Sequence, residues 1–238
     1  MDNAEKQISL IYNTESGDSS KDIISFMISR VLRNRFSEDM GDGAVYFATD
    51  AEEAPDFGSG PLIDIILFEN ISQEDIPRAL QLAQRTSKGA RILAPPGYAF
   101  LEEAKLSLTV TIITYSATDT AANICPNKIT PLADGGFELE AVYQSNPTGR
   151  GSLKDRIFPT YNKNMFGKMK VNSMDRKDIA HALKAFGFGL ALSIEPKYLT
   201  GAISEYVFDS MRNLPKKEEP KQAPSRAACR EEKEFDED

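Results

Sequence analysis

The amino-acid sequence predicts an α/β fold: a mostly parallel, helix-flanked sheet with an antiparallel β extension. Three observations lead to this prediction. Strand and helix patterns alternate over the first hundred residues. Strands rich in β-branched and aromatic residues dominate from 108 to 172. The chain has 238 residues, of which 41% are hydrophobic, and residues 215–238 are almost devoid of apolar side chains. We therefore expect one domain over residues 1–214 and a charged tail over 215–238.

The first half of the chain alternates strands with helices. Short apolar runs predict four strands, at residues 7–12, 44–48, 62–68 and 91–94. The run at 62–68 is nearly continuous, as in parallel strands that are buried on both faces. Apolar residues at helical spacing predict a helix over 22–35. A second helix is expected over 72–85, because Ser72 followed by Asp75 is an acidic variant of a capping box.

The second half begins with strands and ends with helices. Strands are predicted at residues 108–115, 124–130, 137–143 and 169–172, as an antiparallel extension of the sheet. The sequence Asp134-Gly135-Gly136 is a hairpin turn signal. An apolar helix follows over 178–192, where small residues such as Gly187 and Gly189 allow close packing. An amphipathic helix is predicted over 196–211.

Composition excludes several classes of function. The 28 basic and 36 acidic residues give a net charge of −8, which disfavours sequence-independent binding to nucleic acid or anionic lipid. No apolar run approaches the roughly 20 residues that span a bilayer. The first residues lack the charged and apolar regions of a secretory signal. Two cysteines and one histidine are too few for a disulfide framework, a four-cysteine zinc site or a histidine metal cluster. We expect a soluble cytoplasmic protein.

The last 24 or so residues differ from the rest in composition. Residues 215–238 combine mixed charge with several prolines and cannot bury enough apolar surface to offset the entropy of ordering. We therefore expect this tail to be disordered. Its acidic end, at 231–238, is either a solvating segment or a docking segment.

The first candidate site is the polar loop between the first strand and the first helix. A phosphate-binding loop places a glycine turn, a lysine and a serine or threonine in this context. The loop supplies these residue types at Thr14, Gly17, Ser19, Ser20 and Lys21. Asp18, however, stands where the lysine should follow Gly17, and a carboxylate there repels a triphosphate. The alternative is an ordinary polar connection.

Two further candidates lie later in the chain. Residues 69–75 follow the buried strand 62–68, at the sheet edge where α/β proteins hold their ligands. Glu74 and Asp75 there are either ligands for Mg²⁺ or helix-capping carboxylates. His181 is either packed in the core or contacts an adenine.

The order of these pieces resembles the central ATP-binding domain of the Mur ligase family. That family includes the amino-acid-adding enzymes of peptidoglycan synthesis, folylpolyglutamate synthases and cyanophycin synthetase. The resemblance covers most of residues 7–206 and depends on segments 13–20, 69–75, 93–96, 114–116, 134–139 and 175–183. It implies ATP phosphate contacts at Thr14, Gly17, Ser19, Ser20 and Lys21. It also implies adenine contacts at Asp178 and His181, and Mg²⁺ contacts at Glu74 and Asp75.

The chain departs from the family pattern at the residues that carry charge. The phosphate-loop lysine is Asp18, the aspartate–histidine pair is Glu74-Asp75, and the paired aspartates are Pro95-Pro96. The family's adenine-reading asparagines are Asp178 and His181, and its carbamylated lysine has no counterpart. We expect the residues after 211 to be too few for the domain that closes over ATP. The resemblance therefore implies a fold without the groups that form an acyl phosphate.

Three hypotheses follow. The first is a stand-alone degenerate domain, a pseudoenzyme with no certain cofactor that contacts a ligase or another cell-envelope enzyme. The second is an ATP-dependent acid–amino acid ligase or its nucleotide-binding subunit, in which Lys21 reaches the phosphates, Ser19 or Ser20 meets Mg²⁺, and Glu74 and Asp75 hold a second cation. The third is an unrelated α/β binding module. The Mur-like hypotheses predict that the loop at 13–21, Glu74 and His181 converge at the carboxyl edge of the sheet.

Overall fold

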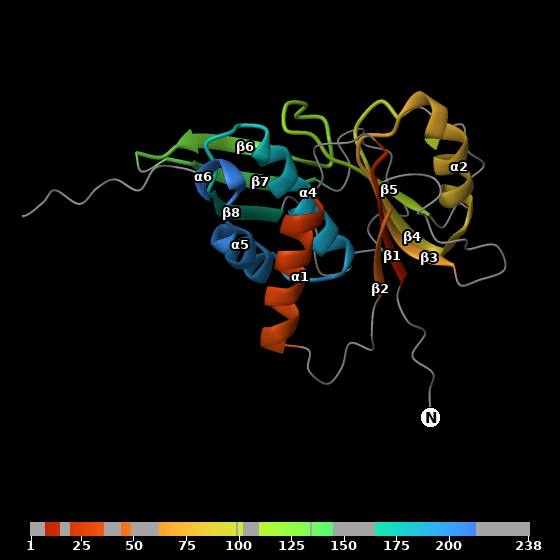
Figure 1. Cartoon of the computed structure of the whole chain (residues 1–238), viewed down its shortest axis with the longest axis horizontal. Coiled ribbons are helices and arrows are strands. Elements are labelled where there is room, and N and C mark those ends of the chain that lie inside the picture. Colours follow the sequence, from red (N-terminus) through yellow and green to blue (C-terminus); the bar gives the residue numbers. More distant parts are fainter. Residues whose placement is uncertain are drawn as a thin grey trace, which may run out of the picture.

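The protein folds into two sheets packed around a buried helix (Figure 1). Its structure, a computed structural model, describes residues 8–14, 20–35, 44–48, 62–98, 100–101, 110–133, 135–144 and 165–212. The predicted tail at 215–238 and the loop residues 15–19 lie outside these ranges. In the described part of the chain no helix has the length and apolar character needed to cross a membrane.

The first sheet is parallel throughout and has the strand order β2-β1-β3-β4-β5. Its strands are β1 (Ile8–Tyr12), β2 (Ala44–Ala48), β3 (Ile63–Phe68), β4 (Thr86–Ala94) and β5 (Thr111–Thr114). Among the described residues, α1 (Lys21–Arg35) follows β1 and α2 (Ile76–Gln84) follows β3. A 3₁₀ turn, η1 (Gln73–Asp75), precedes α2. This arrangement confirms the predicted α/β fold class.

Both faces of the parallel sheet are covered, as the continuous apolar run of β3 predicted. Ile65 and Leu67 of β3 pack into the cluster that contains α1. Ile66 and Phe68, one residue out of phase, pack into a second cluster with α2. Figure 1 shows α2 on one side of this sheet, with α1 and α4 (Asp178–Ala191) on the other. Successive side chains of a strand point to opposite faces, so β3 needs apolar residues at both phases.

The second sheet is antiparallel, with the order β6-β7-β8. Its strands are β6 (Ile124–Pro131), β7 (Phe137–Tyr143) and β8 (Met165–Val171). The predicted turn between β6 and β7 is confirmed by the φ angles of Gly135 and Gly136, 89° and 87°. A Cβ atom at Gly136 would lie 2.7 Å from the carbonyl oxygen of Val171. This turn therefore needs glycine for both its backbone angle and its clearance.

One strand was predicted in the wrong partnership. The segment 108–115 was expected in the antiparallel extension, but β5 pairs in parallel with β4, with Thr111 opposite Arg91. An isolated bridge, Tyr115 to Ile124, links its end to β6. β-branched residues record burial on a pleated surface and carry no information about the direction of the neighbouring strand.

The C-terminal helical region is interrupted where one helix was predicted. The helices are α5 (Pro196–Glu205) and a short α6 (Asp209–Arg212). Between α5 and α6 the backbone is extended. The side chain of Asn172 donates hydrogen bonds to the carbonyls of Ser204 and Tyr206, at 2.7 and 3.0 Å. The amide of Phe208 donates to the Asn172 carbonyl at 3.0 Å. Pairing with the end of β8 therefore replaces the helical hydrogen bonds at this point.

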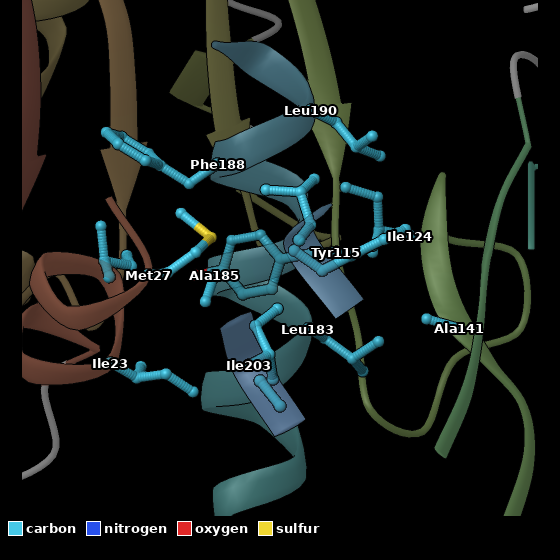
Figure 2. Close-up of a cluster of buried hydrophobic side chains, with 14 of the residues drawn as sticks. Ile23, Met27, Tyr115, Ile124, Ala141, Leu183, Ala185, Phe188, Leu190 and Ile203 are labelled. Atoms are coloured by element: carbon cyan, nitrogen blue, oxygen red, sulfur yellow. The ribbon is translucent and has the colours of Figure 1, made fainter. Parts of the chain in front are cut away.

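The helix α4 lies at the centre of the larger core, between α1, α5 and both sheets (Figure 2). Nearly every residue from Ile179 to Ala191 is buried. The predicted close packing is confirmed, since a Cβ at Gly187 would lie 2.4 Å from Ile124 and one at Gly189 would lie 2.2 Å from Leu199. A helix enclosed on all sides has no solvent face to hold charge, so each charged residue in it needs a partner.

Candidate functional site

The candidate site lies where β3 ends, α1 begins and α4 passes between the sheets. It consists of four side chains, Ser20, Glu69, His181 and Lys184, which come from three separate parts of the sequence. Each of these residues is less than a tenth exposed. The carboxyl edge of a parallel sheet is where α/β proteins place ligands. This cluster lies at that edge, where the predicted site residues were expected.

Glu69 is the central residue of this cluster. Its side chain is fully buried, and its two carboxylate oxygens lie 3.0 and 3.3 Å from the backbone nitrogen of Ser20, which donates to them. Ser20 immediately precedes α1, and its carbonyl accepts the first helical bond, from Ile24 at 3.0 Å. Backbone N–H groups at a helix N-terminus attract anions because the helix dipole adds to their partial charge. Here the anion is the protein's own carboxylate.

A buried lysine neutralises this carboxylate. The Nζ atom of Lys184 lies 3.1 Å from Oε1 of Glu69, and the Lys184 side chain is only 8% exposed. The same ammonium lies 5.8 Å from the centre of the Tyr115 ring, within the range of a cation–π contact. An ammonium buried in an apolar helix is costly unless it is paired, and Glu69 is the partner that α4 requires.

The histidine of the cluster contacts the same loop. The Nδ1 atom of His181 lies 2.9 Å from Oγ of Ser20, so the hydroxyl and the imidazole form a hydrogen bond. His181 and Lys184 are three positions apart on α4, which places them on the same side of the helix. Ser20 therefore joins both groups, through its backbone to Glu69 and through its hydroxyl to His181.

Two tyrosines hold the backbone that carries Glu69. The hydroxyl of Tyr115 donates to the carbonyl of Phe68 at 2.7 Å. The hydroxyl of Tyr98 donates to the Glu69 carbonyl and accepts from the amide of Ile71 at 3.1 Å. Burial raises the pKa of Tyr115 well above its ordinary value, and the negative charge of Glu69 raises it further. Its phenol therefore stays protonated and able to donate.

Thr14 connects the first loop to the same backbone segment. Its hydroxyl donates to the carbonyl of Asn70 at 3.3 Å and accepts from the amide of Ser72 at 2.8 Å. The predicted cap of the following turn is confirmed, because Oγ of Ser72 accepts from the amide of Asp75 at 3.3 Å. The reciprocal bond of a capping box does not form, since Thr14 has already taken the amide of Ser72. The Asp75 carboxylate instead accepts from the Ser72 hydroxyl at 2.7 Å.

The other predicted site residues face elsewhere. The Lys21 ammonium lies over the Phe47 ring, 5.2 Å from its centre, and the residue is exposed. The Asp178 carboxylate accepts hydrogen bonds from the hydroxyls of Ser173 and Ser210 at the start of α4. These contacts tie the start of α4 to the segment after β8 and to α6, one turn before His181.

The remaining predicted site residues are the metal ligands and the positions of the glycine loop. Glu74 is exposed in the η1 turn. No cluster of three or more histidine, cysteine, aspartate or glutamate residues suited to a metal occurs among the residues that the structure describes. Gly17 and Ser19 lie outside these residues. The structure brings Ser20 and His181 into contact, and it ties Thr14 to the segment that follows Glu69, at Asn70 and Ser72.

Sequence reasoning missed Lys184 and the role of Glu69. The available signal was a single lysine inside the apolar helix 178–192, and a glutamate placed directly after a strand that is buried on both faces. Charged residues are almost never fully buried unless they are paired. Two such positions in one core predict a pair, although only the fold shows that they meet.

The comparisons with known proteins concern the fold. No family model matches the sequence, and no curated protein does. MurF from Acinetobacter baumannii is 11% identical, with a TM-score of 0.56 over 87% of this chain and 47% of that one. A UDP-N-acetylmuramoyl-L-alanyl-D-glutamate–2,6-diaminopimelate ligase is 14% identical, with a TM-score of 0.57 over 85% and 46%. The murein peptide ligase Mpl from Psychrobacter arcticus is 11% identical, with a TM-score of 0.54 over 84% and 47%.

These similarities show a Mur-ligase-like fold. The chain spans less than half the length of each of these solved structures. At such low identities a shared fold carries no information on activity, which depends on the residues of the site.

Proposed function

We propose that this chain is a Mur-ligase-like domain that does not catalyse ligation and acts through contacts with another protein. Its partner in this proposal is a ligase or another enzyme of the cell envelope, in the cytoplasm. One observation carries the proposal: the carboxylate of Glu69 occupies the N-terminus of α1, where a phosphate-binding loop would hold its ligand.

Electrostatics support a closed site. A phosphate that approached the Ser20 amide would meet the Glu69 carboxylate, which receives that amide's hydrogen bond at 3.0 Å. Two like charges about 4 Å apart repel each other by about 4 kcal/mol at an effective dielectric constant of about 20. Opening the site would also separate Glu69 from Lys184. A ligand must therefore offset both the repulsion from Glu69 and the loss of the Glu69–Lys184 ion pair before it binds with net favourable free energy.

The cations near the site are engaged with other groups. Acyl-phosphate formation depends on positive charge aimed at the transferred phosphoryl group. The ammonium of Lys184 is paired with Glu69, and that of Lys21 lies over the Phe47 ring. In this proposal a core ion pair stands where a Mur ligase would hold its ligand, and the domain acts through contacts with another protein.

Calorimetric titration of the full chain with Mg-ATP tests the proposal. We expect no binding of micromolar affinity, while a Mur ligase titrated in the same buffer binds. Association with purified Mur ligases, measured by sedimentation velocity, tests the proposed partner. Micromolar ATP binding that is lost in the Lys21→Ala variant would overturn the proposal and favour the ATP-dependent acid–amino acid ligase or its nucleotide-binding subunit.

A further inference from the structure

The described part of the chain has four sheet edges, formed by β2 and β5 in the parallel sheet and by β6 and β8 in the antiparallel one. An edge strand leaves main-chain N–H and C=O groups on its outer side, with which another strand can pair. At two of these edges the fold supplies its own partners. The amide of Thr114 in β5 donates to Oδ1 of Asn123 at 2.9 Å. The amide of Lys170 in β8 donates to the hydroxyl of Ser204 in α5, also at 2.9 Å.

The third edge, β6, carries residues that resist pairing. Pro126 and Pro131 have no amide hydrogen, and the register of β6 shifts between Pro126 and Lys128. Prolines, bulges and exposed lysines are the usual means by which proteins protect sheet edges. The fourth edge, β2, has the sequence AVYFA, without proline or charge, and its register with β1 is continuous from Ala44 to Ala48. Among the described residues, β2 is therefore the one edge without such protection.

The open side of β2 presents the main chain of Val45 and Phe47. On the other side, the amide of Asn13 donates to the carbonyl of Ala48 at 3.1 Å, so the main-chain groups of Ala48 face β1. These groups alternate in direction along a strand, and those of Val45 and Phe47 therefore face away from β1. The side chains of Val45 and Phe47 pack against the larger core cluster. Tyr46 lies on the opposite face of the sheet and is 37% exposed.

We propose that β2 pairs antiparallel with β2 of a second copy of this chain, about a two-fold axis at Tyr46. In this register the amide and carbonyl of Val45 bond to the carbonyl and amide of Phe47 in the second copy, and the reverse bonds follow from the symmetry. The two parallel sheets then form one continuous sheet. Because the pairing uses the open edge of both copies, it closes the assembly at a dimer.

A second copy fits this edge because β2 is its own complement. Tyr46 of each copy lies directly opposite Tyr46 of the other, as a non-hydrogen-bonded pair with Cβ atoms about 4.5–5.5 Å apart. Aromatic pairs at such positions stabilise sheets. The strand also brings no charge to the contact, so two chains that each carry a net charge of −8 place no like charges opposite one another on the paired strands. The pairing goes beyond the proposed function and does not depend on it.

Sedimentation equilibrium of the full chain tests the pairing. A reducing agent is included because the chain has two cysteines. One pair of five-residue strands buries less surface than the roughly 1,200–2,000 Å² of stable interfaces, so we expect a weak dimer, with a Kd on the order of 50 μM. Between about 5 and 500 μM chain, the mean mass should rise from that of the monomer toward that of the dimer and no further.

Two substitutions at one position separate pairing from folding. Val45→Pro removes an amide hydrogen on the open side and none that bonds to β1, so the variant should keep its fold, judged by circular dichroism. We expect it to weaken self-association at least about tenfold, because each copy loses a hydrogen bond to the other. Val45→Thr keeps both the amide and the β-branched shape and should dimerise as the wild type does.

Two further variants test the register. Tyr46→Lys and Tyr46→Glu each place like charges opposite one another in a homodimer, so each should stay monomeric when it is alone. Mixed in equal amounts, the two variants place opposite charges across the axis and should dimerise again. Such a rescue requires that position 46 of one copy meets position 46 of the other, and a general loss of stability does not produce it.

Each outcome decides the question. Dimerisation of the wild type that Val45→Pro abolishes, and that mixing the two Tyr46 variants restores, supports the pairing. If Val45→Pro does not fold, the mixture decides. A wild-type chain that is monomeric at about 500 μM overturns the proposal, even if its open edge binds an extended peptide from another protein. A dimer that survives both Val45→Pro and the separate Tyr46 variants overturns it as well. Titration with ATP bears only on the proposed function.

Discussion

Replacing Lys184 with methionine should reveal how strongly the fold depends on the buried ion pair. Methionine keeps most of the apolar stem in α4 and removes only the charge. At 3.1 Å and an effective dielectric constant of about 20, the attraction between Lys184 and Glu69 is about 5 kcal/mol. Breaking a buried pair on one side leaves an uncompensated charge and costs about 3–5 kcal/mol. We expect a loss of that size in the free energy of unfolding, measured by urea denaturation followed by circular dichroism.

Two comparisons show whether the missing charge is the cause. The Glu69→Gln, Lys184→Met double variant keeps an amide oxygen for the Ser20 amide and removes both charges, so it should return to within about 1 kcal/mol of the wild type. Lys168→Met breaks an exposed pair with Glu138 and should leave the urea midpoint unchanged. The reasoning fails if Lys184→Met costs less than about 1 kcal/mol, or if the double variant is no more stable than the single one.

The remaining predictions concern the hairpin turn and the alkaline limit of stability. Gly136→Ala should lose about 1–3 kcal/mol in urea denaturation, because its φ is 87° and the new Cβ would lie 2.7 Å from the Val171 carbonyl oxygen. In Gly201→Ala, within α5, the new Cβ would have no atom within 4 Å, and the free energy of unfolding should rise by about 0.5–1 kcal/mol. Equal effects of the two substitutions would contradict the turn geometry. Burial, and to a smaller extent the charge of Glu69, raises the pKa of Tyr115 above its ordinary value of 10.0. As pH rises above about 10, the unfolded chain therefore loses the Tyr115 proton before the folded protein does, and the free energy of unfolding should fall. Tyr115→Phe should weaken that fall in urea midpoints measured from about pH 9 to 11, and an unchanged slope would rule out Tyr115 as its cause.

The sequence predicted the fold class because the relevant signals are local. A strand buried on both faces reads as a continuous apolar run, a buried helix reads as apolar at every phase, and Gly135-Gly136 marks a turn that needs positive φ. Each signal depends on a few neighbouring residues and on which faces of the strand or helix are exposed to solvent. The partner of β5 was predicted wrongly, because its residues record burial and not the direction of the neighbouring strand.

The candidate site was predictable only in part. Thr14, Ser20 and His181 were singled out by their types and by their places around the first loop and the long helix. Lys21 and Asp178 were singled out by the same reasoning, but their side chains contact Phe47 and a pair of serines. A residue type shows which bonds a side chain can form, and only the surrounding elements show which of those bonds it does form.

The amino-acid sequence by itself determined the approximate positions of most strands and helices and the burial of β3 and α4, although it did not show the break between α5 and α6. The tertiary structure alone decided that Glu69 meets the start of α1 and that Lys184 neutralises it. The physical reason is distance along the chain. Backbone propensity and hydrophobic period act over a few residues, whereas the energy of a buried charge depends on partners that only folding brings within about 3 Å.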